Sequence, residues 1–182
     1  RQDRIFTSRG VHSRVQLVES GPLVASFRAD YDFPVPCDYG DGAARSESLV
    51  NLPVKVEYRL EAGSPRLLVA VTVDNRARDH WLRAAFPTHL KAAEQSQADS
   101  HFDVVERPIA VPDSTGWVEQ AFGTHPLRTF VTVANGKNGL ALLPKGLFEY
   151  EVTDDETRTL MLTLIRACRI KLAVSEEKLT EL

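Results

Sequence analysis

The chain has 182 residues, of which 43% are hydrophobic and 26% charged, and its net charge is −3. These values are ordinary for a globular protein, and the negative charge excludes the excess of Lys and Arg that nucleic-acid binding needs. No apolar run reaches the ~18 residues of a membrane-spanning helix, so we expect neither a nucleic-acid partner nor a membrane partner.

The two cysteines, Cys37 and Cys168, are isolated in the sequence. Two cysteines form no disulfide framework, and they lack metal-ligand spacing, so we expect both to be reduced. The chain does not begin with Met, and no signal peptide opens it. On these grounds we expect a cytoplasmic protein.

The N-terminal third contains three strand-like segments, Val11 to Glu19, Leu23 to Phe33 and Asn51 to Leu60. In the second segment, apolar residues alternate with charged and polar ones. This pattern is typical of an antiparallel strand with one solvated face.

The segment over 66–88 is the most regular part of the sequence. Leu67, Val69 and Val71 alternate with other residues at period two, and β-branched residues dominate. Asp74 and Asn75 favour a turn, and alternation resumes from His80 to Phe86. The segment therefore predicts a β-hairpin.

The rest of the chain predicts further short strands. The polar segment Lys91 to Ser100 has no periodicity and indicates a surface excursion or one short helix. Five strand-like segments follow, at 103–107, 129–133, 139–143, 148–152 and 159–165. About ten short strands without a convincing long helix predict an all-β antiparallel sandwich. We find no linker that divides the chain, so we expect a single domain over residues 1–182.

The same segments carry a resemblance to a known family. The sequence VDNRARDHWLRAAFPT at 73–88 resembles the C-terminal β-sandwich region of family 38 glycoside hydrolases, the α-mannosidases. Matching segments follow in order: FDVVERP at 102–108, WVE at 117–119, HP at 125–126, GLALLPKGLFEYEV at 139–152 and LMLTLIRA at 160–167. The resemblance runs from about Gly63 to Leu172.

This resemblance implies a supersandwich of the galactose-mutarotase type and a place in a longer enzyme. In that family a zinc ion and an Asp nucleophile lie on a separate catalytic barrel that precedes this region. The chain would then brace the missing N-terminal catalytic domain, and its carbohydrate ligand would be an α-mannoside. We expect no metal and no catalytic residue within the chain itself.

The residues agree with that expectation. Most candidate carboxylates fall in turns, where solvated side chains are the ordinary outcome: Asp74, Asp79, Asp154, Asp155 and Glu156. The five histidines are scattered singly, without the close spacing of metal ligands.

Four residues are candidates for contact with a sugar. Trp117 follows Thr115 and Gly116 in a loop-like stretch, so it is less core-like than the other aromatic candidates Trp81, Phe122 and Tyr150. Glu119 and His125 form the one carboxylate–histidine pair that could act as acid and base.

Arg166 is the fourth candidate. Period two places it on the face of Leu160, Leu162 and Leu164. It either extends to water at the end of its strand or points toward the catalytic barrel. The family resemblance favours the second, because an arginine of this region approaches the substrate cleft there.

Two alternative functions remain open at this point. An autonomous carbohydrate-binding module would need an exposed aromatic platform. An aldose-mutarotase-like enzyme would need Glu119 and His125 to converge in a cleft. Fold analogy alone is poor support for such an activity.

Overall fold

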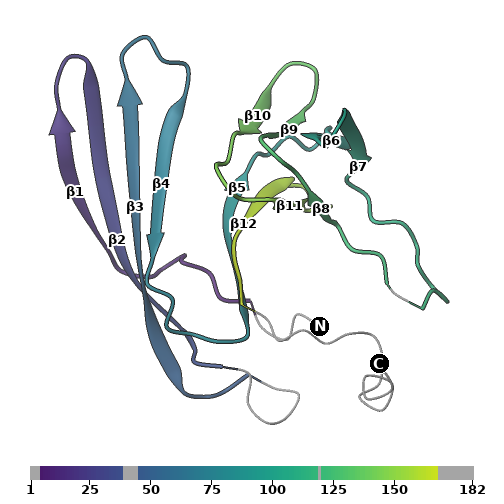
Figure 1. Cartoon of the computed structure of the whole chain (residues 1–182), viewed down its shortest axis with the longest axis horizontal. Coiled ribbons are helices and arrows are strands. Elements are labelled where there is room, and N and C mark those ends of the chain that lie inside the picture. Colours follow the sequence, from purple (N-terminus) through teal and green to yellow (C-terminus); the bar gives the residue numbers. More distant parts are fainter. Residues whose placement is uncertain (1–4, 39–44, 119, 168–182) are drawn as a thin grey trace. The chain divides into compact units, whose positions relative to one another are not determined.

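The computed structural model describes residues 5–38, 45–118 and 120–167. These residues form twelve β-strands and no helix, so the described part contains no helix that could span a membrane. The strands form three four-stranded sheets, and every strand pair with a defined register is antiparallel. The prediction of an all-β antiparallel fold is confirmed (Figure 1).

The chain separates into two compact units. Unit 1 contains Arg1–His80 and Ala167–Leu182, and unit 2 contains Trp81–Arg166. Nothing in this division tests the single domain that we expect, so the single domain stays a prediction.

The strands of unit 1 form sheet I in the order β1-β2-β3-β4. Their bounds are β1 (Ser13–Ser20), β2 (Val24–Pro36), β3 (Leu49–Glu61) and β4 (Leu67–Val73). The register aligns Leu17, Phe27, Tyr58 and Val69 in one row across all four strands. The rings of Phe27 and Tyr58 stack in this row, with centroids 4.9 Å apart. One face of sheet I is therefore apolar, as the period-two pattern predicts.

The opposite face of sheet I is charged. Arg28 pairs with Asp30, and Arg59 pairs with both Glu61 and Glu19. All of these side chains are at least partly exposed, so each pair contributes little to stability.

The predicted hairpin over 66–88 is wrong. β4 pairs with β3 in sheet I, whereas β5 (His80–Pro87) belongs to another sheet. The connection between them is tied back to earlier strands, because the Asp74 amide donates to the Pro53 carbonyl and the Arg78 amide to the Cys37 carbonyl. A chain held in this way cannot close the tight turn that a hairpin needs.

Unit 2 contains two sheets. Sheet II has the order β10-β9-β6-β7, and sheet III has the order β5-β12-β11-β8. Besides β5, the bounds are β6 (Gln95–Asp99), β7 (Val104–Pro108), β8 (Thr124–Pro126), β9 (Val131–Ala134), β10 (Gly139–Leu142), β11 (Glu149–Val152) and β12 (Thr159–Ala167).

The core of unit 2 takes side chains from both of its sheets. Ala98, Val131 and Val133 come from sheet II, whereas Tyr150 and Leu160 come from sheet III, and all five are fully buried. One cluster joins them, so sheets II and III form a sandwich.

Two strands of unit 2 are absent from the sequence prediction. β6 occupies the segment that we expected to be a surface excursion or a helix, so that expectation is wrong. Its buried residues are Ser96 and Ala98, which are too small and too polar to produce a hydrophobic alternation. β8 has three residues, too few for a periodic signal.

Candidate functional site

The outer face of sheet III carries a compact polar cluster, which we call the Trp81 network. Tyr150 and Val152 of β11 are buried in the core, so period two turns Glu149 and Glu151 to the opposite face. Side chains of the three other strands meet them there. The network consists of Trp81, Arg83, Thr124, Glu149, Glu151, Thr163 and Arg166.

One half of the network is a chain of hydrogen bonds that ends on Arg166. The Trp81 indole N–H donates to Thr163 Oγ1 at 2.9 Å, and the Thr163 hydroxyl donates to Glu149 Oε1 at 2.8 Å. The other oxygen of Glu149 accepts from Arg166 Nη1 at 2.7 Å. The orientation of the Glu149 carboxylate is therefore fixed from two sides.

The other half is centred on Arg83. Its guanidinium carbon lies 3.4 Å from the centroid of the Trp81 ring, in cation–π contact. Arg83 forms an ion pair with Glu151, and its Nη2 donates to Thr124 Oγ1 at 3.3 Å. Its Nε is buried and has no hydrogen-bond partner among the described residues. This arginine is a structural part of the face, with 13% of its side chain exposed.

Arg166 is the member that can meet a ligand. It is the penultimate residue of β12, and 61% of its side chain is exposed. Strict alternation from the buried Leu160 and Leu162 would put it on the core side, but its Nη1 reaches Glu149 on the outer face. Its guanidinium carbon lies 5.1 Å from the Trp81 centroid. Because Glu149 engages one nitrogen, the remaining N–H groups can donate to oxygen atoms of a ligand. The carboxylates of Glu149 and Glu151 each pair with a guanidinium group. This face therefore offers hydrogen-bond donors to a ligand, and it does not offer an acid–base pair.

The other predicted site residues lie elsewhere. Trp117 lies in the loop between β7 and β8, and 58% of it is exposed. Glu119 lies outside the described residues. His125 pairs in register with Tyr150 and so lies on the core side of sheet III, opposite to the Glu149 side. The structure therefore does not bring Arg166 and His125 together.

The surroundings of His125 favour its neutral form. Its ring lies against Tyr150, with centroids 5.9 Å apart. Burial lowers the pKa of His125, the nearby Arg107 guanidinium lowers it further, and Glu151 partly opposes this shift. A neutral imidazole packed on a core tyrosine is a structural residue.

Sequence reasoning missed most of the Trp81 network. The available signal was the alternation of Trp81 with Arg83 in one strand and of Glu149 with Glu151 in another. Each pair lies on one face at period two, but only the strand order shows that the two faces coincide.

The residues that the structure describes do not fit a zinc ion. No group of three or more His, Cys, Asp or Glu side chains that could hold a metal occurs in the described part of the chain. A zinc site needs at least three such protein ligands.

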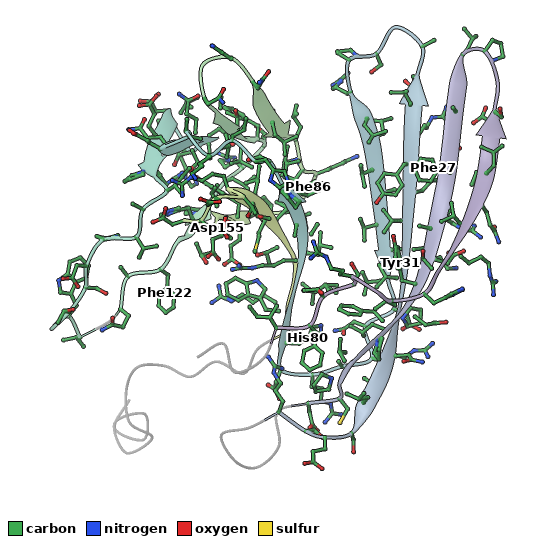
Figure 2. All side chains as sticks on the ribbon, turned by 180° about the vertical axis from the view of Figure 1, so that it is seen from behind. Phe27, Tyr31, His80, Phe86, Phe122 and Asp155 are labelled. Atoms are coloured by element: carbon green, nitrogen blue, oxygen red, sulfur yellow. The ribbon has the colours of Figure 1, made fainter. Side chains whose placement is uncertain are left out.

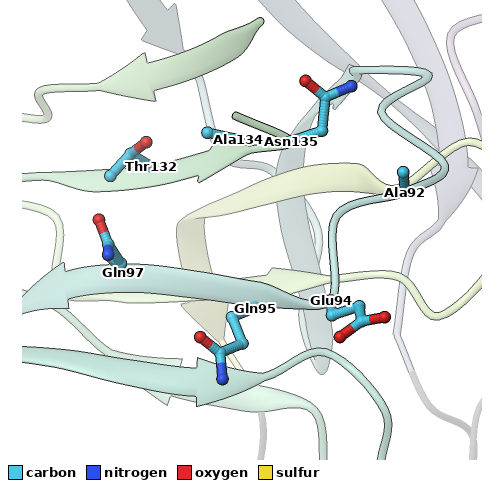
Figure 3. A pocket seen from close by; sticks show the side chains of 7 residues that line it. All are labelled: Ala92, Glu94, Gln95, Gln97, Thr132, Ala134 and Asn135. Atoms are coloured by element: carbon cyan, nitrogen blue, oxygen red, sulfur yellow. The ribbon is translucent and has the colours of Figure 1, made fainter. Parts of the chain in front are cut away.

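A second feature of unit 2 is a shallow hollow on the outer face of sheet II (Figure 3). It measures about 380 Å³ and is lined by Ala92, Glu94, Gln95, Gln97, Thr132, Ala134 and Asn135. Most of these residues are polar and none is aromatic.

Comparison with known proteins decides the family. The family model "Glycosyl hydrolases family 38 C-terminal domain" matches residues 1–171. The chain belongs to this family.

The relatives of this family 38 domain are much longer proteins. The chain is 30% identical over 177 residues to a protein of Halalkalibacterium halodurans named "Putative mannosylglycerate hydrolase". The match covers 89% of this chain and 19% of that relative. Among solved structures, an alpha-mannosidase from Enterococcus faecalis V583 has a TM-score of 0.78 and 26% identity, over 88% of this chain and 19% of that one.

A second Enterococcus faecalis structure supports the fold. This protein of glycosyl hydrolase family 38 has a TM-score of 0.75 and 24% identity. The match again covers 88% of this chain and 19% of the Enterococcus faecalis chain. The chain thus spans about one fifth of the length of the relatives it matches (19%).

Proposed function

We propose that this chain is the non-catalytic C-terminal β-domain of a longer family 38 glycoside hydrolase that acts on α-mannosides. The observation that carries this proposal is the family match over 171 residues combined with the 19% share of each relative. In such a protein the domain braces the catalytic domain, which is its main partner.

The chemistry of the described residues supports a bracing role for this domain and catalysis by the rest of the longer protein. A glycosidase needs two carboxyl groups that flank one glycosidic bond. In the Trp81 network, Glu149 and Glu151 are each held by an arginine instead. We therefore place the zinc ion and the nucleophile of the proposed enzyme in the remainder of the longer protein.

Arg166 is our first choice for a direct contact with the substrate. Its guanidinium is exposed, and Glu149 holds it in one orientation. A planar guanidinium donates to paired oxygen atoms, such as vicinal sugar hydroxyls or a carboxylate. Trp117 is a second contact that we propose, through stacking on a sugar ring, whereas nothing in the structure favours Glu119 or His125.

The names of the relatives suggest two substrate classes, simple α-mannosides and mannosylglycerate. The second carries a carboxylate, for which Arg166 is chemically suited. Kinetics on one neutral and one acidic mannoside would distinguish these classes.

A reconstitution experiment tests the proposed function. The longer protein should release p-nitrophenol from p-nitrophenyl α-mannoside when zinc is present. The 182-residue chain alone should release none, with or without zinc. Adding the chain to a truncated protein that lacks it should restore activity. Zinc-dependent hydrolysis by the isolated chain would overturn the proposal.

An autonomous carbohydrate-binding module is the second candidate. Trp117 and Phe122 favour it, because they are 58% and 74% exposed in the loop before β8. Replacing Trp117 by Ala should then abolish retention of the isolated chain on immobilised mannan. No observation favours the mutarotase alternative, since His125 lies on the core side of its sheet.

A further inference from the structure

We propose that the hollow on the outer face of sheet II is a carbohydrate-binding surface for neutral sugars. It is separate from the Trp81 network, which lies on the outer face of sheet III. This proposal needs only the geometry of unit 2, so it can hold even if the proposed enzyme function fails.

The strand register builds the hollow. One cross-strand row contains Ala141, Thr132, Gln97 and Glu106, in neighbouring strands. The next row contains Gly139 beside Ala134. Side chains at these positions point away from the core, because Ser96, Ala98, Val131 and Val133, which alternate with them, are buried.

Small residues keep this face open. Ala92 and Ala134 line the hollow, and Gly139 and Ala141 lie beside it in β10. A Cβ atom at Gly139 would lie 3.0 Å from the Ala134 Cβ and 3.2 Å from the Val133 carbonyl oxygen. A larger residue at 139 would therefore push the neighbouring residues of β9 away by a few tenths of an ångström.

The polar groups around the space are available to a ligand. The side chains of Gln95, Glu94 and Thr132 form no hydrogen bond with another described residue. Gln97 Nε2 donates to Glu106 Oε1 at 2.6 Å, which fixes the amide and leaves its carbonyl oxygen free. Asn135 accepts two backbone N–H groups, which leaves its side-chain NH₂ free.

These groups select the chemical class of the ligand. The one charged residue in the lining, Glu94, is acidic, and so is Glu106, which accepts a hydrogen bond from the lining residue Gln97. Phosphates, nucleic acids and acidic peptides are therefore disfavoured. The absence of aromatic and large aliphatic residues from the lining disfavours apolar ligands. Amide and hydroxyl groups both donate and accept, as sugar hydroxyls do. A volume of about 380 Å³ lies within the usual range for small-ligand sites.

Figure 3 shows how Gln97 and Thr132 project from adjacent strands on one side of the sheet. Because these two residues are direct cross-strand neighbours, a sugar lying over them could accept from and donate to both side chains. Because the hollow is open and has no ring to stack on, the affinity should be weak, with a Kd on the order of millimolar.

Saturation-transfer NMR on the 182-residue chain tests this proposal, with methyl α-mannoside as the neutral probe and mannose 6-phosphate as the anionic one. We expect transfer to the neutral probe and little to the phosphate. Gln97→Ala and Thr132→Val should each weaken binding about threefold to tenfold, as loss of one hydrogen bond implies. Ala134→Arg, which fills the hollow without removing a lining group, should abolish it.

Two controls make the result decisive. Gln16→Ala changes an exposed glutamine of sheet I that lies in the other unit, so it should leave binding unchanged. Trp117→Ala should also leave binding unchanged, because Trp117 belongs to the aromatic loop of the alternative function and does not line the hollow. No transfer to wild-type protein, equal transfer to both probes, or binding that survives Ala134→Arg would each overturn the proposal. The same Ala134→Arg change should weaken retention of the longer protein on mannan, and unchanged retention would also count against the proposal.

Discussion

Tyr150 and Ser96 share a hydrogen bond across the core of unit 2, with 3.0 Å between Tyr150 Oη and Ser96 Oγ. Tyr150 belongs to sheet III and Ser96 to sheet II, so this bond joins the two layers of the sandwich. Arg107 Nη1 also donates to Tyr150 Oη, at 3.3 Å. A buried polar group in an apolar core costs free energy unless it is paired, and here both partners of the tyrosine hydroxyl come from sheet II.

Replacing Tyr150 by Phe should lower the free energy of unfolding by about 1–2 kcal/mol, because Ser96 and Arg107 both lose their hydrogen bond to the buried hydroxyl. Urea unfolding monitored by circular dichroism measures this change. Tyr58→Phe is the matched control, because its hydroxyl has no hydrogen-bond partner in the described part of the chain, and it should change stability by less than about 0.5 kcal/mol. Equal effects of the two variants would contradict the role of the interlayer bond.

Asp99 should make stability depend on pH. Desolvation alone would raise the pKa of Asp99, but the Thr129 hydroxyl and the backbone amides of Phe130, Thr129 and Arg128 donate to its carboxylate and hold the pKa well below its ordinary value. A depressed pKa stabilises the fold at pH values above the unfolded pKa of about 3.9, and this contribution is lost as pH falls toward the folded pKa.

Asp99→Asn should therefore lower the melting temperature at pH 7, and the difference from wild type should shrink below about pH 4. Thr129→Val removes one of the donors and should give an intermediate difference. Melting curves between pH 2 and pH 7 measure both. A difference that stays constant over this range would show that the carboxylate charge has no part in the effect.

Substitutions of Glu149 and Glu151 test whether Arg166 contacts the substrate, because each glutamate pairs with a different arginine. In the longer enzyme, Glu149→Gln should release the Arg166 guanidinium and lower kcat/KM for an α-mannoside about threefold to tenfold, the loss that one hydrogen bond to the transition state implies. Arg166→Ala should lower it at least as much. Arg166→Ala should alter the melting temperature little, because 61% of that side chain is exposed.

Glu151→Gln removes an equivalent partner one pleat along the same strand. It leaves the less exposed Arg83 without its ion pair, so it should cost about 1–3 kcal/mol of stability while kcat/KM stays near the wild-type value. If the two glutamate variants behave alike, Arg166 has no special role at the substrate.

The apolar face of sheet I should make the isolated chain bind hydrophobic dyes and self-associate. Leu17, Leu60 and Leu67 are 71%, 52% and 55% exposed on this face. Apolar patches of this kind bind hydrophobic dyes and promote association. We expect dye fluorescence and self-association at micromolar protein.

Replacing Leu17 and Leu67 by Lys should reduce both signals. Lys55→Gln, on the charged face of the same sheet, is the control and should change neither. A strictly monomeric wild-type chain without dye binding would contradict this prediction.

The sequence predicted those parts of the fold that depend on local alternation. Sheet I is the clearest example, because each of its strands is apolar on one side and its bounds differ from the expected ones by a few residues (Figure 2 shows Phe27 and Tyr31 on β2). Asn-Gly is likewise a local signal for a tight turn, and Asn135 and Gly136 lie in one, with a positive φ of 83° at Gly136 and a hydrogen bond from the Asn135 amide to the Asn138 carbonyl.

Strand partnership could not be predicted in the same way. β4 and β5 look like a hairpin in the sequence, but which sheet a strand joins depends on hydrogen bonds between distant residues. The Trp81 network escaped prediction for the same reason, since its members span 86 positions from Trp81 to Arg166. Arg166 was nominated by its period-two register together with the family resemblance, and its role in substrate binding stays a prediction.

The placement of β5 beside β12 has a practical consequence. The chain enters unit 2 through β5 and leaves it through β12, and these strands are neighbours in sheet III (Figure 1). The two ends of residues 81–166 therefore lie close together, as they do in domains that tolerate insertion into a host. We expect that residues 81–166 can be exchanged between relatives as one unit. We also expect that the two ends can be joined and new ends opened at the Asn135 turn, which would give a circular permutant.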